Sequence, residues 1–344
     1  MTGPARHAAR LAALGVGLFA LAVALPGVAV ADHQGSGCGF PVTETDATGT
    51  EVTVEEPAED VVVLDASSAQ VFWEIGAQDR VVGMPVEDFT AYLEGSTEKT
   101  DVTDGQQVLV ERVVELEPDL VLAPNYLGEE TMTQLRGAGL TVYQLPLEDS
   151  FEAIYRKTAL YGHVVGECEA ANDTVAETRA EVEELREAVA GRDRPRVLYF
   201  FFGFAAGDGT FINDLVETAG GRNVAAEAGV DGYVELSKEV VAERDPEWIV
   251  APSHAGLPEG EPFESTTAFE RNQTLVVDEN LVSQAGPRVV VPLRTMAETF
   301  HPEAFESNGT GTPTPSPAPG DAGPGFGALA ALVALVATVI LARR

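Results

Sequence analysis

Two stretches of the chain repeat the same order of polar and apolar positions. Residues 111–124 read ERVVELEPDLVLAP, and residues 239–252 read EVVAERDPEWIVAP. In each copy a short amphipathic helix runs up to a proline, which cannot continue a helix, and an apolar run follows. A run flanked in this way is typical of a strand that is buried on both faces of a parallel sheet. The repeat therefore predicts two similar α/β lobes.

A weaker repeat precedes each copy. Residues 61–83 and 196–225 both read as a strand, a small polar loop, a helix, a glycine and a second strand. Between the two lobes, residues 151–191 carry apolar side chains on one helical face and many glutamates on the other. We expect a long rigid helix there, and Gly162 and Gly166 favour a break near its beginning.

The predicted fold class is α/β, with two Rossmann-like lobes joined by a long rigid helix and a ligand cleft between the lobes. Ligands of α/β sheets bind beyond the carboxyl ends of the strands, which is why a cleft is expected there. The expected segments are a signal peptide (1–31), an N-terminal extension (32–57), an N-terminal lobe (58–150), the connecting helix (151–191), a C-terminal lobe (192–304), a Thr/Pro-rich stalk (305–323) and a membrane anchor or sorting signal (324–344).

Both ends of the chain are interpreted as targeting segments. Arg6 and Arg10 precede an apolar run that closes on Ala-Val-Ala, which predicts a secretory signal cleaved before Asp32. A membrane-spanning anchor helix is the alternative for this segment. At the other end, an apolar segment of about 16 residues would be roughly 24 Å long as a helix, just enough to cross a bilayer. The terminal Arg343 and Arg344 would then lie in the cytoplasm.

The charge of the chain excludes one class of partner and indicates an environment. Lys and Arg number 21 against 55 Asp and Glu, which gives a net charge of −34. Nucleic acid is therefore not expected as a partner, because phosphate binding needs a basic surface. The acidic residues are spread along the chain and few of the basic ones are lysine, a composition that resembles proteins of salt-loving archaea. Concentrated salt screens the mutual repulsion of such a surface.

Two further patterns bear on the exported part of the chain. The only cysteines are Cys38 and Cys168. An oxidising exterior favours one disulfide between them, and two separate thiols remain the alternative. The pattern Asn-x-Thr, which marks acceptor sites for N-glycosylation, occurs at Asn172, Asn272 and Asn308.

The order of motifs resembles a known family. GGRNVA (220–225) and LSKEVV (236–241) carry the resemblance most specifically, and it covers about residues 40–304. The chain resembles the class III solute-binding proteins that capture cobalamin, ferric siderophores or haem for ABC importers. The resemblance implies an ABC permease dimer and its ATPase as partners. The Pro-Gly-Phe tail resembles the PGF-CTERM signal of archaeal surface proteins, which an archaeosortase removes and a lipid replaces.

Glu111 and Glu239 stand at matching positions of the repeat. In the family, one carboxylate at the tip of each lobe meets arginines of the permease, so the resemblance implies a docking role for both. Exposed opposite charges of this kind orient association and raise its rate. The alternative is that both are ordinary solvated glutamates, and their matching register favours docking.

The resemblance places the ligand between the lobes, where aromatic side chains suit a large, partly apolar molecule. The cobalamin-binding members have an aromatic residue at the place of Tyr233, but their matching aromatic in the first lobe is missing here, at Gly105 and Gln106. The C-terminal lobe also offers Phe201 and Phe204. The predicted ligand-binding residues are Tyr92, Tyr126, Phe202, Tyr233 and Arg288.

These observations predict a receptor on the cell surface that captures a corrinoid for an ABC importer. A ferric siderophore or haem is the alternative ligand, and a cell-surface module without a transport role is the alternative of another class. An enzyme is not expected, because no nucleophile motif or phosphate-cradling loop occurs. The five histidines show no metal-site spacing, so no metal or cofactor of the protein's own is expected.

Overall fold

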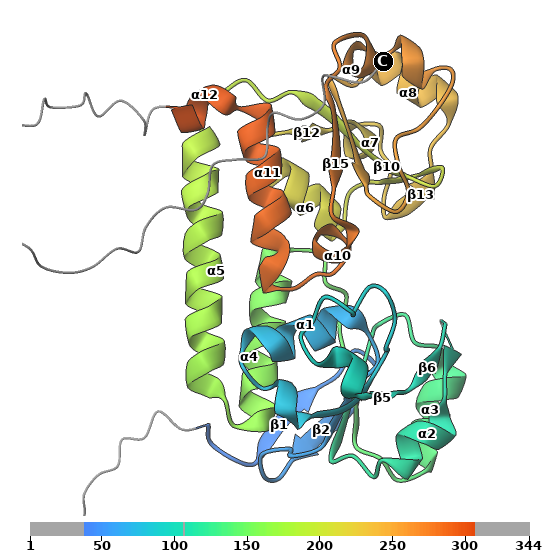
Figure 1. The fold of residues 1–344 in the computed structure, drawn as a ribbon, viewed down its shortest axis with the longest axis vertical. Coiled ribbons are helices and arrows are strands. Elements are labelled where there is room, and N and C mark those ends of the chain that lie inside the picture. Colours follow the sequence, from blue (N-terminus) through green and yellow to red (C-terminus); the bar gives the residue numbers. More distant parts are fainter. Residues whose placement is uncertain (1–37, 106, 307–344) are drawn as a thin grey trace, which may run out of the picture. The chain divides into compact units, whose positions relative to one another are not determined.

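The structure is a computed structural model that describes residues 38–105 and 107–306 (Figure 1). The predicted signal peptide, nearly all of the stalk and the C-terminal anchor lie outside these residues. The chain forms two compact units: unit 1 takes the residues up to Leu147 and Glu152–Glu177, and unit 2 takes Glu148–Phe151 and the residues from Thr178 onward. In the described part of the chain, no helix combines the length and apolarity that a membrane crossing needs.

A five-stranded parallel sheet forms the centre of unit 1, in the order β5-β4-β3-β8-β9. Its central strand is buried on both faces, because Val61 and Val63 pack into one apolar cluster and Val62 packs into another. This is the environment that its unbroken apolar run predicts. The strands of this sheet are β3 (Val61–Val63), β4 (Val81–Met84), β5 (Thr100–Asp101), β8 (Leu120–Ala123) and β9 (Val142–Gln144).

Helices cover both faces of this sheet. The first of them begins where Asp65 accepts a hydrogen bond from the backbone N–H of Ser68 at 2.8 Å, so that a side chain replaces one missing helical partner. The helical segments of unit 1 before its C-terminal part are α1 (Ala66–Glu74), η1 (Gln78–Arg80), η2 (Ser96–Glu98), α2 (Val110–Glu115), α3 (Glu129–Gly137) and α4 (Phe151–Val165), whose first residue belongs to unit 2.

A β-hairpin opens the described chain, and Gly49 lies in its turn at φ 79°, a left-handed backbone that glycine adopts without strain. Its anchor is the buried Asp46, which accepts hydrogen bonds from the backbone N–H groups of Thr48 at 2.8 Å and Thr50 at 3.0 Å. Asp46 also forms an ion pair with Arg136 of α3. The short strands outside the main sheets are β1 (Val42–Thr45), β2 (Glu51–Val54), β6 (Thr103–Asp104) and β7 (Gln107–Val108).

The connecting segment differs from the single helix expected over residues 151–191. It consists of α4 and α5 (Cys168–Val189), separated at Gly166, whose backbone is left-handed at φ 83°. Gly162 does not break α4 but lets the two helices approach, since a Cβ there would lie 2.2 Å from the Cβ of Ala171. The chain passes between the units before Glu148, in the first turn of α4 and again within α5. A disulfide between Cys38 and Cys168 ties the first turn of α5 to the N-terminal segment.

Unit 2 contains a sheet in the order β13-β11-β10-β14-β15, with β12 paired to the beginning of β10. Strands β10, β14 and β15 are parallel to one another, while β11 and β13 run antiparallel and extend the sheet beyond the end of β10. The strands of unit 2 are β10 (Arg196–Phe201), β11 (Phe204–Ala206), β12 (Arg222–Asn223), β13 (Tyr233–Glu235), β14 (Trp248–Pro252) and β15 (Thr274–Val277).

Capped helices alternate with these strands. Thr210 and Ser237 cap two of them by accepting hydrogen bonds from the backbone N–H groups of Asn213 and Val240. The helical segments of unit 2 are α6 (Phe211–Thr218), α7 (Val224–Glu227), α8 (Lys238–Arg244), η3 (Phe263–Ser265), α9 (Thr267–Glu270), α10 (Glu279–Val282), η4 (Pro287–Val289), α11 (Val290–Phe300) and α12 (Pro302–Phe305).

Each copy of the sequence repeat forms a helix followed by a strand, one such pair in each unit. Helix α2 leads into β8, which lies beside the central strand β3, and helix α8 leads into β14, which lies beside β10. A left-handed residue follows each helix immediately before the repeated proline, Glu117 at φ 48° after α2 and Asp245 at φ 42° after α8. The prediction of two similar α/β lobes is confirmed.

Candidate functional site

One face of the sheet in unit 2 is aromatic. Antiparallel partners share a face, so the pairs Phe201–Phe204 and Ala206–Tyr233 place three aromatic side chains on the same side. Alternation along β10 adds Tyr199 to this side and puts Leu198 and Phe200 into the core on the other. We call Tyr199, Phe201, Phe204 and Tyr233 the aromatic face.

The rings of the aromatic face contact one another at the spacing of attractive aromatic pairs. Phe201 is central, with ring centroids 6.0 Å from Tyr199, 6.1 Å from Phe204 and 5.8 Å from Tyr233. Within the aromatic face, Tyr199 is buried, whereas Tyr233 is 52% exposed. Burial raises the pKa of the Tyr199 hydroxyl, the neighbouring Tyr233 adds to this, and a hydrogen bond with Ser283 opposes it. Tyr199 is therefore neutral at physiological pH.

A tight turn holds Phe202 beyond the end of β10. Phe202 and Gly203 are the two loop residues between β10 and β11, and both have positive φ, 48° and 93°. Two-residue hairpins of this kind favour Asn-Gly, because a left-handed backbone strains most side chains. Phe202 is nevertheless 64% exposed, so burial of its ring in this unit does not offset that strain.

His254 extends the surface toward the next strand. It lies two residues after the end of β14, and its ring centroid lies 5.2 Å from that of Phe202. Since β10 and β14 are parallel neighbours, both rings stand at carboxyl ends of strands, where α/β sheets bind ligands. The predicted ligand-binding residues do not include His254, although its place just beyond the apolar run of β14 makes it a candidate by sequence.

The predicted residues of the N-terminal lobe also follow strand ends. Tyr126 lies just after β8 and is 76% exposed. Tyr92 lies in the loop after β4, where its hydroxyl accepts a hydrogen bond of 2.9 Å from Nε2 of the buried Gln70. The exposed Phe89 lies in the same loop. These residues belong to unit 1 and the aromatic face to unit 2.

The remaining predicted residues occupy helical segments. Arg288 is half-buried in η4. Glu111 and Glu239 are each the second residue of their helices, α2 and α8, and both side chains are exposed. The structure therefore keeps the two glutamates equivalent, as the repeat predicts.

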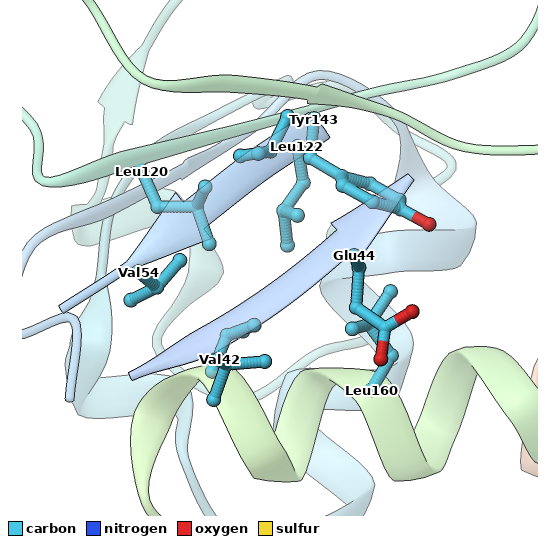
Figure 2. A pocket seen from close by; sticks show the side chains of 9 residues that line it. Val42, Glu44, Val54, Leu120, Leu122, Tyr143 and Leu160 are labelled. Atoms are coloured by element: carbon cyan, nitrogen blue, oxygen red, sulfur yellow. The ribbon is translucent and has the colours of Figure 1, made fainter. Parts of the chain in front are cut away.

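Two other kinds of site can be assessed in the described residues. Residues 38–105 and 107–306 contain no group of three or more His, Cys, Asp or Glu side chains that could hold a metal ion. A cavity of about 10 Å³ lies in unit 1 beneath the N-terminal hairpin, lined by residues such as Val42, Leu122 and Leu160 (Figure 2). Its volume corresponds to about one water molecule, so it cannot hold a large ligand.

Comparison with known proteins decides the family. The family profile described as "Periplasmic binding protein" matches residues 61–277. The chain belongs to the periplasmic binding protein family. Its members are the substrate-binding components of ABC importers and work with a permease and an ATPase, so the family serves transport and not catalysis. A PGF-CTERM motif matches residues 323–344, which indicates anchoring at the cell surface.

Individual relatives agree with this assignment. The chain is 40% identical to a "Cobalamin-binding protein" of Halobacterium salinarum over 361 aligned positions, 97% of each chain. It is 26% identical to a "Vitamin B12-binding protein" of Yersinia pestis over 71% of this chain and 86% of that protein. The crystal structure of heme binding protein HmuT superposes with a TM-score of 0.66 at 25% identity, covering 76% of this chain and 90% of the other. The predicted family and fold class are confirmed.

Proposed function

We propose that this protein captures a corrinoid outside the cell and delivers it to the permease of an ABC importer, without a cofactor of its own. The observation that carries the proposal is the 40% identity, over 97% of both chains, to a protein named for cobalamin binding. The aromatic face supports it, because exposed rings suit the broad, partly apolar surface of a corrin.

Haem is the second candidate ligand. The solved structures that this chain resembles include proteins titled heme binding, such as HmuT at a TM-score of 0.66. A porphyrin is also flat and largely apolar, so the aromatic face suits it for the same physical reason. The full-length similarity to a cobalamin-binding relative makes the corrinoid the first choice.

Calorimetric titration of the exported domain in molar salt tests the choice directly. We expect saturable heat with cobalamin and much weaker heat with haem or a ferric hydroxamate. Tight binding of haem with no response to cobalamin would replace the corrinoid by the second candidate. No binding of any of the three chelates would contradict the proposal as a whole.

The aromatic face is proposed to contact the ligand, together with Phe202. Phe204→Ala and Tyr233→Ala should each weaken binding about 2- to 10-fold, since an aromatic contact contributes about 0.5–1.5 kcal/mol. Val291→Ala is the matched control, because Val291 is 50% exposed on α11 and outside this face. Equal losses in all three variants would show that the aromatic face has no special role.

Tyr92, Tyr126 and Arg288 are proposed as further ligand contacts. Tyr126 follows the carboxyl end of the parallel strand β8 in unit 1, and this end is where α/β sheets bind ligands. Arg288 supplies a cation that can donate hydrogen bonds to the amide or carboxylate groups at the rim of a chelate. Replacing each residue by alanine and titrating the same ligand tests the three assignments separately.

Glu111 and Glu239 are proposed to dock on arginines of the permease. Their removal should leave ligand affinity unchanged and reduce uptake, because each partner arginine would lose a charge-assisted contact at about 2–5 kcal/mol. Glu115 and Glu243 provide the control, since they are exposed, lie four residues further along the same two helices, and match each other in the repeat.

The comparison to make is Glu111→Ala with Glu239→Ala against Glu115→Ala with Glu243→Ala. Both double variants remove two negative charges, so a general effect of net charge would appear equally in both. We expect uptake to fail only in the first pair. Normal uptake in that pair, or loss of its ligand binding, would contradict the docking role.

Export and anchoring complete the proposal. We propose that residues 1–31 are removed as a secretory signal and that an archaeosortase replaces the PGF-CTERM segment by a lipid. N-terminal sequencing of the protein from cell membranes should begin at Asp32. Its mass should lack the last segment and include a lipid; an intact C-terminus would instead make the apolar segment a retained anchor.

A further inference from the structure

The structure distinguishes two of the three Asn-x-Thr patterns; the third, at Asn308 beside the stalk, is the most exposed candidate by sequence and lies outside the described residues. Asn172 and Asn272 lie in the described residues, and both are exposed. Asn172 lies in the second turn of α5, and the hydroxyl of Thr174 donates a hydrogen bond of 2.9 Å to the carbonyl oxygen of Ala170. Asn172 and Thr174 are therefore both held within a continuous helix.

Asn272 lies in a turn on the surface of unit 2. It follows α9 with a left-handed backbone at φ 55°. The backbone N–H of Asn272 donates to the carbonyl of Phe269 at 3.2 Å, and that of Gln273 donates to Ala268 at 2.7 Å. This pair of bonds is the Schellman motif, which ends a helix and turns its last residue outward.

The side chain of Asn272 is available in this turn. Among residues 38–105 and 107–306, no hydrogen bond or ion pair engages its amide, and the residue is exposed. A left-handed backbone by itself explains an asparagine at this position. It does not explain a threonine two residues later, because Thr274 begins β15, where valine or isoleucine would serve equally well.

The neighbouring strand needs protection. β15 is the last strand of its sheet, so one of its sides has no partner strand among the described residues. Its residues, Thr-Leu-Val-Val, carry no charge and no proline, and Val276 is 48% exposed. Such an edge is a template for pairing with another chain, and proteins usually block it with charges, bulges or a covering group.

We propose that Asn272 is N-glycosylated in the exported protein and that its glycan covers the free edge of β15. In the modification, Nδ2 of Asn272 forms a bond to the anomeric carbon of a lipid-phosphate-linked sugar. The bond from that carbon to the phosphate oxygen breaks, the lipid phosphate leaves, and the amide nitrogen loses one proton. The bulky polar glycan then stands beside the first residue of the edge strand.

Peptide mass spectrometry of the full chain, purified from a glycosylating haloarchaeal host, tests the modification. Cleavage after glutamate releases residues 271–279, which contain Asn272, and residues 170–177, which contain Asn172. We expect a sugar mass on the first peptide and none on the second. An unmodified 271–279 peptide would overturn the proposal, and equal modification of both would overturn the structural distinction.

Two conservative substitutions then test the protective role. Thr274→Val removes the acceptor pattern while keeping a branched strand residue and leaving Asn272 in its turn. Thr274→Ser preserves the pattern and is the matched control. We expect Thr274→Val to lose the sugar mass and to self-associate at least several-fold more than the wild type in sedimentation, while Thr274→Ser behaves as the wild type.

The outcomes separate the two parts of the proposal. Loss of the sugar with no increase in self-association would show that the glycan does not protect β15. Self-association of Thr274→Ser to the same extent would trace the effect to the strand itself. The ligand titration is independent of both, because neither Asn272 nor Thr274 belongs to the proposed ligand contacts.

Discussion

Phe202 offers the sharpest test of the ligand site, because stability and binding should respond to it in opposite directions. Its left-handed backbone, at φ 48°, costs about 1–2 kcal/mol for an ordinary side chain. Asparagine adopts this conformation more readily, and Asn-Gly is the favoured pair for a two-residue hairpin. Phe202→Asn should therefore raise the free energy of unfolding by about 0.5–1 kcal/mol.

The same substitution removes a ring that is 64% exposed in unit 2. If that ring contacts the ligand, its loss should weaken binding by about 1 kcal/mol or more, which is roughly a fivefold rise in Kd. The predicted variant is thus more stable in thermal unfolding, by a few degrees, and binds less tightly in calorimetry. Strain that is retained at a binding surface is the physical basis of this trade.

Glu117 supplies the control for the backbone effect. It has the same φ of 48°, is exposed, lies in the turn after α2 of unit 1, and is none of the proposed contacts. Glu117→Asn should raise stability similarly and leave ligand affinity unchanged. Phe202→Ala should lose affinity without the gain in stability, since alanine does not favour the left-handed region.

Two results would refute the reasoning. A Phe202→Asn variant that is less stable than the wild type would mean that the ring stabilises the fold by more than the backbone strain destabilises it. A variant that is more stable and binds the ligand as tightly as the wild type would remove Phe202 from the site. Both measurements belong in molar salt, where the acidic surface is screened.

Three further predictions concern the scaffold. Replacing Cys38 and Cys168 by serine should lower the free energy of unfolding by about 5 kcal/mol, as the chain-entropy model gives for a separation of 130 residues, and reducing agent should have the same effect on the wild type in chemical denaturation. Asp46→Asn should lower the free energy of unfolding by about 2–4 kcal/mol in the same assay, because Asp46 is buried and Arg136 would lose the carboxylate of its ion pair. Burial acts to raise the pKa of the Asp46 carboxyl, but hydrogen bonds from Thr48, Thr50 and Gln144 together lower it below 3.8. The stability that Asp46 contributes is therefore present above pH 3.8 and is lost as the pH falls through the lowered pKa. In that acidic range, the unfolding midpoint of the wild type should fall toward that of the Asp46→Asn variant. Because salt screens the repulsion within a net charge of −34, the thermal unfolding midpoint should rise as the salt concentration increases from about 0.1 to about 3 M. An unchanged midpoint would contradict adaptation to salt.

The repeat is the part of the fold that the sequence predicted best. Its apolar runs became β8 and β14, each beside the central strand of its sheet, because a run that is apolar at every position has to be buried on both faces. The turn at Gly49 shows the same agreement between residue type and backbone, since few residues other than glycine tolerate its positive φ. In these places local chemistry and the global fold agree.

The connecting segment shows where such reasoning ends. Gly162 and Gly166 are the same residue four positions apart, and both were expected to mark one break. Gly166 supplies a left-handed backbone that ends α4, whereas Gly162 sits inside the helix and makes room for Ala171 of α5. A glycine needed for its backbone and one needed for close packing look identical in a sequence, and only the partner helix distinguishes them.

Phe201, Phe204 and Tyr233 were named from the sequence, but their arrangement with Tyr199 as one aromatic face could not be predicted, for a related reason. The letters Phe-Phe-Phe-Gly-Phe read as a core strand, in which alternation buries every second ring. The two-residue turn at Phe202 and Gly203 reverses the chain, so that Phe204 returns to the side of Phe201 and leaves Phe200 alone in the core. The turn at Phe202 and Gly203 therefore decides which of these phenylalanine side chains lie in the core and which lie on the surface. Since that turn carries phenylalanine where asparagine would fit better, the stability of the hairpin does not explain its sequence, whereas the proposed ligand contact of Phe202 would.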